Sequence, residues 1–301
     1  MDSKPVVSVT IPTKNSATKH SMPTFERCLE SVVSQGVPVE IVVADDESTD
    51  GTVDIARSFG ARVVGDARPL LQARYEAFRA SRGDIVIMLD SDQLLEEGAL
   101  SRCLEAMREH DVLVLGERSA EGGGWISRLY AADKRLLHRR ADFHMDPKRA
   151  SLLPRVFRRS VLEQAFASIP ERLRRAVLFQ DHIMIHKLVM DLSPSVGIVP
   201  DAVRHLEMDT LRELWRKYYR WGAQLPMEYR DFPEFRTLNR RQVASRFGSG
   251  GVPMSDRLQA YLLVVLKAVP YGLGFLKGRL SWRLSSTRSP GRSVPPNAAS
   301  S

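Results

Sequence analysis

Residues 84–93 read DIVIMLDSDQ, an apolar run that ends in two acidic residues, Asp90 and Asp92. An apolar run of this length is typical of a strand that is buried on both faces of a parallel sheet. Three similar runs precede it along the chain, at 6–11, 40–44 and 62–65. We therefore expect four strands within the first 90 residues.

Apolar residues recur at helical spacing in the segments between these runs, which predicts helices at 25–34, 52–59 and 70–81. Strands that alternate with helices of this length form βαβ units, and such units build a parallel sheet. We therefore predict an α/β fold with a mostly parallel central sheet flanked by helices.

Polar residues follow the predicted strands at the points where the strands end. In open parallel sheets ligands bind beyond the carboxyl ends of the strands, so these positions are candidates for a binding site. They are Thr13 and Asn15 after the first strand, Asp45 and Asp46 after the second, and Asp90 and Asp92 after the fourth.

Asp90 and Asp92 flank Ser91 directly after the apolar strand. If the chain turns there, both carboxylates lean toward one cation, and hard oxygen ligands suit Mg²⁺ or Mn²⁺. Such a cation would neutralise the negative charge that develops on a departing diphosphate. Acidic pairs of this spacing also occur in loops and helix caps, so the interpretation needs support from other segments.

Three segments supply that support: VSVTIPTKN at 7–15, EIVVADDESTDGT at 40–52 and QARYEAFRASRGDIVIMLDSDQ at 72–93. In this order and spacing they resemble the glycosyltransferase family 2 proteins, and the resemblance covers about the first 220 residues. It implies a GT-A nucleotide-sugar-binding fold and an inverting transfer of a sugar from a nucleotide diphosphate-sugar.

The resemblance also implies roles for individual residues. Asp45 would accept a hydrogen bond from the base, usually uracil, so a UDP-sugar is expected ahead of a GDP-sugar. Arg74 would lie near the base or the diphosphate. In the D-x-D motif the second acidic residue would bind the metal directly, and the amide oxygen of Gln93 would assist. The implied nucleotide-sugar-binding residues are Pro12, Thr13, Asn15, Asp45, Asp46, Arg74, Asp90, Ser91 and Asp92.

Two further candidates lie later in the chain. Asp181, in LFQDHIMI, stands where the resemblance implies a catalytic base that takes a proton from an acceptor hydroxyl, although Gln180 replaces the usual Glu. Against an ionised phosphate acceptor, Asp181 would orient rather than deprotonate. His205, in the second of two strands expected at 195–199 and 202–206, is a candidate third metal ligand beside Asp90 and Asp92. A helix-capping Asp181 and a structural His205 are the simpler alternatives.

The KYYRW segment at 217–221 partly resembles the Q-x-x-R-W motif of processive family members, with Lys217 in place of Gln. The long membrane spans of processive synthases are not found, so we expect transfer of one sugar per encounter. The aromatic residues could equally pack within an amphipathic helix, whose start is predicted by a capping box at Thr210 and Glu213.

Basic residues are concentrated in two segments of a chain whose formal net charge is +8. Residues 128–178 contain 13 Lys or Arg against 5 Asp or Glu, and seven basic residues but no acidic one follow Asp256. The Arg-rich segment at 154–160 could hold an acceptor phosphate, and the apolar residues of 258–280 could lie on a membrane. The predicted acceptor is a polyprenyl phosphate or a membrane-surface glycan or lipid; a solvated basic surface and a packed C-terminal helix are the alternatives.

No segment has the roughly 18 uncharged apolar residues of a membrane span. The nearest candidate, 258–275, contains Lys267 and Pro270. The start of the chain has no signal-peptide pattern, and Cys28 and Cys103 lack the spacing of a disulfide framework or a metal site. We therefore expect a cytoplasmic protein, which would work at the cytoplasmic face of the membrane if its acceptor is lipid-linked.

The sequence divides into four predicted parts. They are a nucleotide-sugar-binding half at 1–115, an acceptor-binding half at 116–225, a helical C-terminal extension at 226–284, and a disordered tail at 285–301.

Two other functions remain open. A GT-A-like nucleotidyltransferase would share the fold, but residues 12–19 lack the Gly-rich basic loop usual in that class. A non-catalytic nucleic-acid- or phosphate-binding protein would explain the basic charge, but the chain contains no recognisable nucleic-acid-reading module. We therefore expect no nucleic-acid partner.

Overall fold

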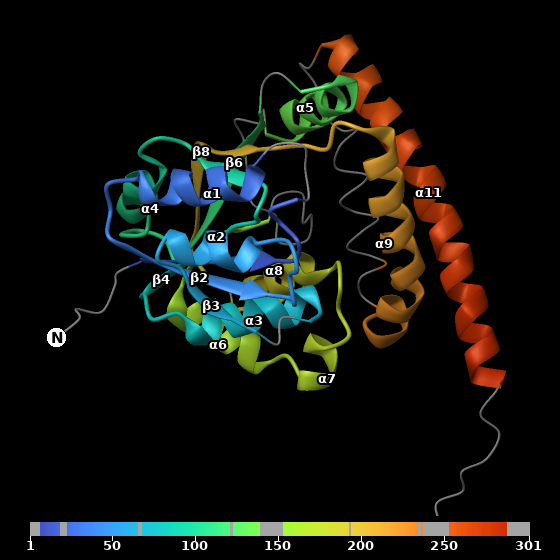
Figure 1. Cartoon of the computed structure of the whole chain (residues 1–301), viewed down its shortest axis with the longest axis horizontal. Coiled ribbons are helices and arrows are strands. Elements are labelled where there is room, and N and C mark those ends of the chain that lie inside the picture. The colour runs from blue at the N-terminus through green and yellow to red at the C-terminus, as the bar shows by residue number, and fades with distance from the viewer. Residues whose placement is uncertain are drawn as a thin grey trace, which may run out of the picture.

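A computed structural model describes residues 7–18, 23–65, 68–120, 123–138, 153–192, 194–233, 236 and 253–287. Of the predicted tail at 285–301, residues from 288 onward lie outside the described residues. Figure 1 shows a body built from a curled sheet with helices around it, and two long helices, α9 (Leu211–Asp231) and α11 (Met254–Thr287), along one side.

One sheet of eight strands runs through the body in the order β3-β2-β1-β4-β7-β6-β8-β5. The neighbours β3, β2, β1 and β4 are parallel, as predicted. The second half is mixed, because β7 runs antiparallel to β4 and β6, and β5 runs antiparallel to β8. The strands are β1 (Val7–Thr13), β2 (Val39–Asp45), β3 (Arg62–Val64), β4 (Ile85–Met88), β5 (Gln93–Leu95), β6 (Val112–Ser119), β7 (Val156–Arg158) and β8 (Val196–His205).

Strand β8 differs from the sequence expectation, because it is one strand where two were predicted. It pairs in parallel with β6 along its length, across a register shift between Leu115 and Glu117. A Cβ atom on Gly116, at this shift, would lie 2.6 Å from the backbone nitrogen of Asp201, so the close approach of the two strands requires glycine. Strands β5 and β7 were not predicted, since three residues are too few to show a period.

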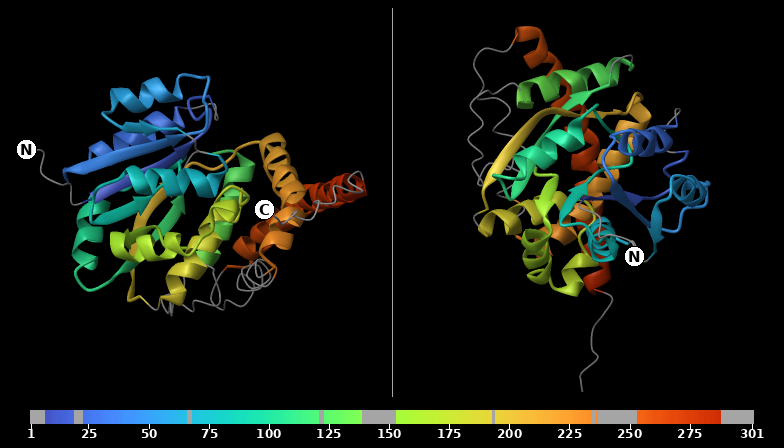
Figure 2. Two further views of the ribbon diagram at one scale, coloured as in Figure 1. Left: turned by 90° about the horizontal axis from the view of Figure 1, so that it is seen from below. Right: turned by 90° about the vertical axis from the view of Figure 1, so that its left-hand side faces the viewer.

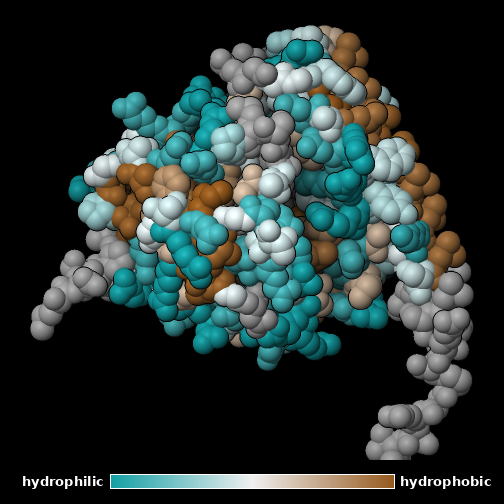
Figure 3. Space-filling model, in the orientation of Figure 1, coloured by the Kyte–Doolittle hydropathy of each residue, from teal (hydrophilic) through white to brown (hydrophobic). Residues whose placement is uncertain are grey.

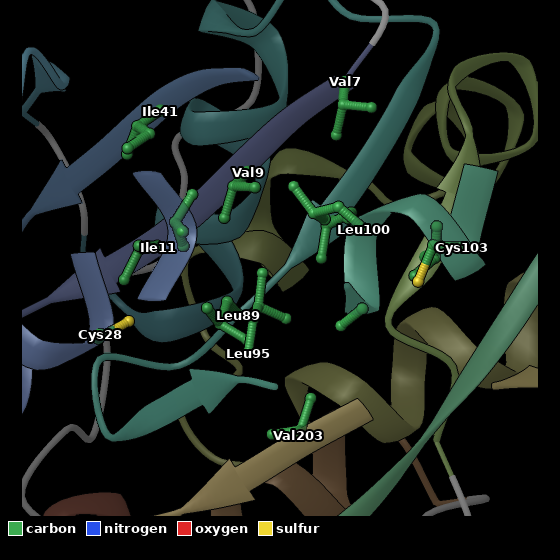
Figure 4. Packing of buried hydrophobic residues seen from close by; sticks show 14 of the residues in the cluster. Val7, Val9, Ile11, Cys28, Ile41, Leu89, Leu95, Leu100, Cys103 and Val203 are labelled. Carbon is green, nitrogen blue, oxygen red and sulfur yellow. The ribbon is translucent and has the colours of Figure 1, made fainter. Parts of the chain in front are cut away.

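Apolar side chains fill both faces of the sheet. One cluster lies between the sheet and helices α1, α2 and α4, and Figure 4 shows part of it, including Cys28 and Cys103. Both cysteines are buried and free. A second cluster lies between the sheet and helices α3, α6 and α8, beside the short α7. These helices are α1 (Thr24–Val33), α2 (Thr52–Ser58), α3 (Leu70–Ala80), α4 (Ala99–Ala106), α6 (Arg159–Ala167), α7 (Glu171–Arg174) and α8 (Asp181–Asp191).

Helices α5 (Trp125–His138), α9 (Leu211–Asp231) and α11 (Met254–Thr287) pack together through a third apolar cluster. The two views of Figure 2 show α9 and α11 side by side. The predicted capping box between Thr210 and Glu213 is confirmed at the start of α9. The two helices touch through backbone, because a Cβ on Gly222 would lie 2.0 Å from the carbonyl oxygen of Tyr271.

Helix α11 also differs from the sequence expectation. Lys267 and Pro270 were expected to interrupt the apolar segment, but the helix continues through both. Within the described residues, Met254–Ser281 is long and apolar enough to cross a membrane by length and composition. Core helices of soluble proteins pass the same test, so this finding alone is weak evidence for a span.

Candidate active site

The loops that follow β1 and β2 are joined around Asp45, at the end of β2. Its buried carboxylate accepts hydrogen bonds from Thr13 Oγ1 at 2.9 Å and from the N–H and the hydroxyl of Ser48 at 2.8 and 2.6 Å. Asn15, at a positive φ of 47°, donates its N–H to Ser48 Oγ at 2.8 Å and accepts from the N–H of Thr49 at 2.9 Å. The predicted residues Thr13, Asn15 and Asp45 therefore belong to one hydrogen-bonded unit.

Basic side chains border this unit. Lys14 Nζ donates to one carboxylate oxygen of Asp46 at 2.7 Å, and Arg68 Nε donates to the other. Pro12 is buried within β1 opposite Ala44, so it shapes the backbone rather than offering a polar contact. Two exposed cations at a strand end suit an anionic ligand such as a diphosphate.

The loop after β4 joins the same edge of the sheet. Ser16 Oγ, after β1, donates to Ser91 Oγ, after β4, at 3.1 Å. The N–H of Ser16 also donates to Thr52 Oγ1 at 2.9 Å, at the start of α2. The structure therefore brings together the predicted residues that follow β1, β2 and β4, as the parallel topology requires.

Arg74 links the loop after β4 to the N-terminus of α8. It is 1% exposed. Its Nη2 donates to Asp90 Oδ1 at 2.6 Å, and its Nε donates to Asp181 Oδ2 at 2.5 Å. Because a buried guanidinium needs its anionic partners to offset desolvation, this arrangement holds both carboxylates in place. Arg74, predicted beside the nucleotide, is buried here as the residue that positions Asp90 and Asp181.

Arg155 and His182 complete this ion-pair network. Arg155 Nη1 lies 3.0 Å from Asp90 Oδ2 and 2.5 Å from His182 Nε2. Burial alone would raise the pKa of Asp90, but Arg155 and Arg74 outweigh it and hold this pKa well below its usual range. Burial and the same two arginines lower the pKa of His182 to about 4, so its imidazole is neutral at pH 7.

Asp92 and His205 meet on the other side of the loop, with Asp92 Oδ1 3.2 Å from His205 Nε2. Two ligands at adjacent corners of an octahedron, each about 2.1 Å from the cation, are about 3 Å apart, so this pair fits one Mg²⁺ or Mn²⁺ ion. His205 Nδ1 lies 3.0 Å from Glu207 Oε1, and such a carboxylate orients a metal-binding imidazole. Burial would lower the pKa of His205, but Glu207 and Asp92 raise it to about 9 despite the opposing charge of Lys134.

The three predicted metal ligands do not form one cluster. Asp90 is turned to the two arginines, and among the residues that the structure describes no group of three or more His, Cys, Asp or Glu is arranged to hold a metal. Gln93 is engaged as well, because its Oε1 accepts from the N–H of Asp90 at 2.9 Å and its Nε2 donates to Glu117 at 3.0 Å. The fit to a metal therefore rests on Asp92 and His205, and oxygens from a bound donor would have to complete the shell.

The Arg-rich segment at 154–160 is committed to contacts within the protein. Arg155 pairs with Asp90, Arg158 Nε donates to Asp111 at 3.0 Å, and Arg159 Nε donates to the carbonyl of Gly83 at 2.6 Å. These bonds hold β7 in the sheet and give the three arginines partners within the protein, while the phosphate contact stays a prediction.

Glu228, on α9, holds the loop that leads into Asp181. Its Oε1 accepts hydrogen bonds from the backbone N–H groups of Leu178 at 2.7 Å and Phe179 at 3.0 Å. Burial raises the pKa of Glu228 to about 6, against these two hydrogen bonds and with help from the charge of Asp181. The sequence does not reveal this role, because it depends on how α9 packs against the body.

Replacing Glu228 by glutamine should raise the free energy of unfolding near pH 8 by about 2 kcal/mol and leave it almost unchanged near pH 4. Glutamine keeps an oxygen for both backbone bonds and removes a charge that is 2% exposed. Because the pKa of Glu228 in the folded protein, about 6, lies above the usual value of 4.5, the wild-type protein loses stability as the pH rises through this interval. Urea unfolding of both proteins at both pH values measures the effect. Glu228→Ala, which loses the acceptor, should be destabilised at both, and a pH-independent gain in Glu228→Gln would contradict this account.

The KYYRW segment packs beside the same loop. The Trp221 ring lies 5.2 Å from the Phe179 ring and 5.3 Å from the Tyr218 ring, measured between centroids. Lys217 Nζ lies 4.9 Å from the centroid of Trp221. This is the aromatic packing expected as the alternative to a processive motif, and it places α9 against the residues that precede Asp181.

The residues that the sequence analysis missed have only weak signals. His182 follows Asp181 directly, Glu207 stands two positions after His205, and Arg155 lies in the segment that was noted for its charge. Chain proximity to a candidate residue could have suggested the first two. Glu228 has no such signal.

Comparisons with known proteins point to one family. A model of the family described as glycosyl transferase family 2 matches residues 8–165, just over half of the chain. An N-acetylglucosaminyltransferase of Azorhizobium caulinodans is 27% identical over 252 residues, which cover 75% of this chain and 60% of that protein. A dolichol-phosphate mannosyltransferase of Pyrococcus furiosus is 28% identical over 123 residues, 39% of this chain and 34% of that protein. The chain thus spans less than two thirds of the length of these relatives.

Two solved structures share the fold. The mannosyltransferase PcManGT of Pyrobaculum calidifontis, solved with GDP-Man and Mn²⁺, aligns with a TM-score of 0.51 at 18% identity, over 96% of this chain and 77% of that one. Residues 1–349 of Staphylococcus aureus TarS align with a TM-score of 0.50 at 16% identity, over 93% and 91% of the two chains. The likeness confirms the predicted GT-A arrangement of sheet and helices.

Proposed function

Because the chain belongs to glycosyl transferase family 2, we propose that it moves one sugar per encounter, with inversion and with the help of a metal ion, from a nucleotide diphosphate-sugar to an acceptor at a membrane surface. The observation that carries the proposal is the pairing of Arg74 with both Asp90 and Asp181. One buried side chain thereby joins the acidic motif of the donor side to the candidate base.

The donor is proposed to be a UDP- or GDP-sugar bound at the carboxyl ends of β1, β2 and β4. The hydrogen-bonded unit of Thr13, Asn15 and Asp45 would bind the nucleoside. Lys14 and Arg68 would lie on the phosphate side, where exposed cations attract a diphosphate. The structure of PcManGT contains GDP-Man and Mn²⁺, which supports this class of donor.

Asp92 and His205 are the proposed ligands of the Mg²⁺ or Mn²⁺ ion, with Glu207 orienting His205. When bound, the cation would neutralise the charge that develops on the leaving diphosphate. Asp90, held by two arginines, would fix the loop that presents Asp92 to the donor.

Asp181 is the proposed base. As an acceptor hydroxyl oxygen forms its bond to the anomeric carbon, its proton would pass to the Asp181 carboxylate. The bond between the anomeric carbon and the β-phosphate oxygen would break on the opposite side, and the nucleoside diphosphate would leave with the electron pair. One displacement of this kind inverts the anomeric centre. An acceptor phosphate would need no base, and Asp181 would then orient it.

The division of labour follows the predicted parts of the chain. Residues 1–115 would bind the donor, 116–225 the acceptor, and the helical extension at 226–284 would contact the membrane. The proposed acceptor is a polyprenyl phosphate or a membrane-surface glycan or lipid, reached from the cytoplasmic face. The name of the Pyrococcus furiosus relative, a dolichol-phosphate mannosyltransferase, supports a lipid-phosphate acceptor.

A donor panel tests the proposal directly. The protein is incubated with UDP- and GDP-sugars, Mn²⁺ and a membrane lipid extract, and the products are identified by mass spectrometry. We expect one donor to give a lipid extract component that is heavier by one sugar, and we expect chelator to abolish the product. Pyrophosphate-dependent cleavage of the donor would instead indicate a nucleotidyltransferase. Nucleic-acid binding without any binding of sugar nucleotides would overturn both enzymatic readings.

A further inference from the structure

Helix α11 carries a continuous apolar stripe on one side. Its side chains are 41–68% exposed and, apart from the adjacent Tyr261 and Leu262, recur every three or four residues, which places them along one side of the helix. Figure 3 shows hydrophobic surface along the outer edge of the molecule where α11 runs. The α11 stripe consists of Met254, Leu258, Tyr261, Leu262, Val265, Val269, Leu273, Leu276 and Leu280.

The opposite side of α11 is tied to the body. Leu263 is buried in the cluster with α5 and α9. Asp256 accepts two hydrogen bonds from Arg135, at 2.8 and 2.9 Å. A Cβ on Gly274 would lie 2.1 Å from the carbonyl oxygen of Tyr219, so α9 and α11 touch through backbone. Because a membrane-crossing α11 would lose these contacts, the packing favours a helix that lies along a membrane over one that spans it.

Charge identifies the partner that suits this stripe. After Asp256 the sequence contains seven basic residues and no acidic one. Lys277 and Arg279 belong to the C-terminal half of the helix, where they lie over the rings of Tyr219 and Phe275. Anionic headgroups complement this charge, whereas pairing with a second copy of the chain would bring two basic segments together.

We propose that the α11 stripe inserts into one leaflet of an anionic bilayer, with α11 in the plane of the membrane. From Leu258 to Leu280 the helix is about 33 Å long at 1.5 Å per residue, which gives an extended line of contact. This inference deepens the proposed action at a membrane surface and rests on it for the choice of acceptor. It also places the membrane on the side of α11 that faces away from α9, whose Glu228 holds the loop before Asp181.

Vesicle flotation of the whole chain without donor or acceptor tests the inference. Vesicles of phosphatidylcholine with about one third phosphatidylglycerol should bind the wild-type chain at least 10-fold more tightly than pure phosphatidylcholine vesicles, because each basic residue near an anionic surface adds to the affinity. Val269→Glu with Leu273→Glu should weaken binding to the anionic vesicles about 30-fold, because two inserted apolar side chains become charged.

Matched variants and a second measurement keep the outcomes distinct. Val33→Glu changes an apolar side chain of α1 that is 50% exposed, and it should leave vesicle binding unchanged. Equal binding of the wild type and the stripe variant, or no binding by either, would overturn the inference. Sedimentation without lipid that shows a dimer broken by the stripe variant would overturn it in favour of self-association. Donor hydrolysis by the same samples in solution tests the transferase proposal separately. Failure of the membrane proposal therefore does not imply failure of the transferase proposal, or the reverse.

Discussion

Asp181→Asn should lower the rate of sugar transfer at saturating donor and acceptor by about 10²–10⁴-fold when the acceptor is a hydroxyl, the range that a positioned general base contributes. Asparagine still offers Oδ1 to the Nε of Arg74, so the buried contact survives while the proton acceptor is lost. Donor affinity, measured by calorimetry with Mn²⁺, should change by less than about 3-fold because Asp181 acts on the acceptor side.

The control for this variant is Asp191→Asn, at the other end of α8. Asp191 pairs with Lys187 on the helix surface, so its replacement should leave the transfer rate unchanged. The size of the loss in Asp181→Asn also reports the acceptor class, since an ionised phosphate needs no deprotonation and should show a smaller loss. If Asp181→Asn transfers sugar to the native acceptor at a rate within 2-fold of the wild type, Asp181 has no catalytic role.

Asp92→Asn should lower kcat/KM by about 10³-fold and weaken the dependence of the reaction on Mn²⁺. The reason is that Asp92 would hold the cation, and a cation at the leaving diphosphate stabilises the transition state by several kcal/mol. Glu207→Gln should have a milder effect and weaken metal affinity by about 10–100-fold, since Glu207 acts only through the orientation of His205. Metal titrations of donor binding and steady-state rates measure both effects.

Asp54→Asn provides the comparison for Asp92→Asn. Asp54 lies on α2 with 88% of its side chain exposed, so the same change of charge there should leave the rate and the Mn²⁺ titration unaltered. Circular dichroism and thermal unfolding should show that all these variants are folded. If donor affinity is unchanged by chelator and unchanged in Asp92→Asn, the proposed role of the cation is ruled out.

The nucleotide-binding half could be predicted closely because its signals are local. Strands β1, β2 and β4 are apolar runs followed by polar residues, and apolar residues recur at helical spacing in the helices between the strands. The capping box at Thr210 and Glu213 is local too, since both bonds form within one turn. Strand β8 was divided wrongly, because its continuity depends on pairing with β6 across Gly116.

The candidate site was predicted only in part. Residue types at strand ends pointed to Asp45, Asp90 and Asp92, and the resemblance to the family pointed to Asp181. The pairing of Asp92 with His205 joins residues 113 positions apart, and the Arg74 bond to Asp181 joins residues 107 positions apart. Contacts between residues so far apart in the chain leave no periodic signal in the sequence, because they depend on how the sheet curls.

Local patterns were enough to predict the strands and helices of the first 90 residues, the resemblance to a family, and the acidic residues at the edge of the sheet, since each depends on neighbours in the chain. Long-range packing buries Arg74 between two carboxylates, turns Asp90 toward arginines and leaves one side of α11 exposed. Those outcomes depend on which surfaces meet when distant segments pack, and burial then decides which charges must be paired.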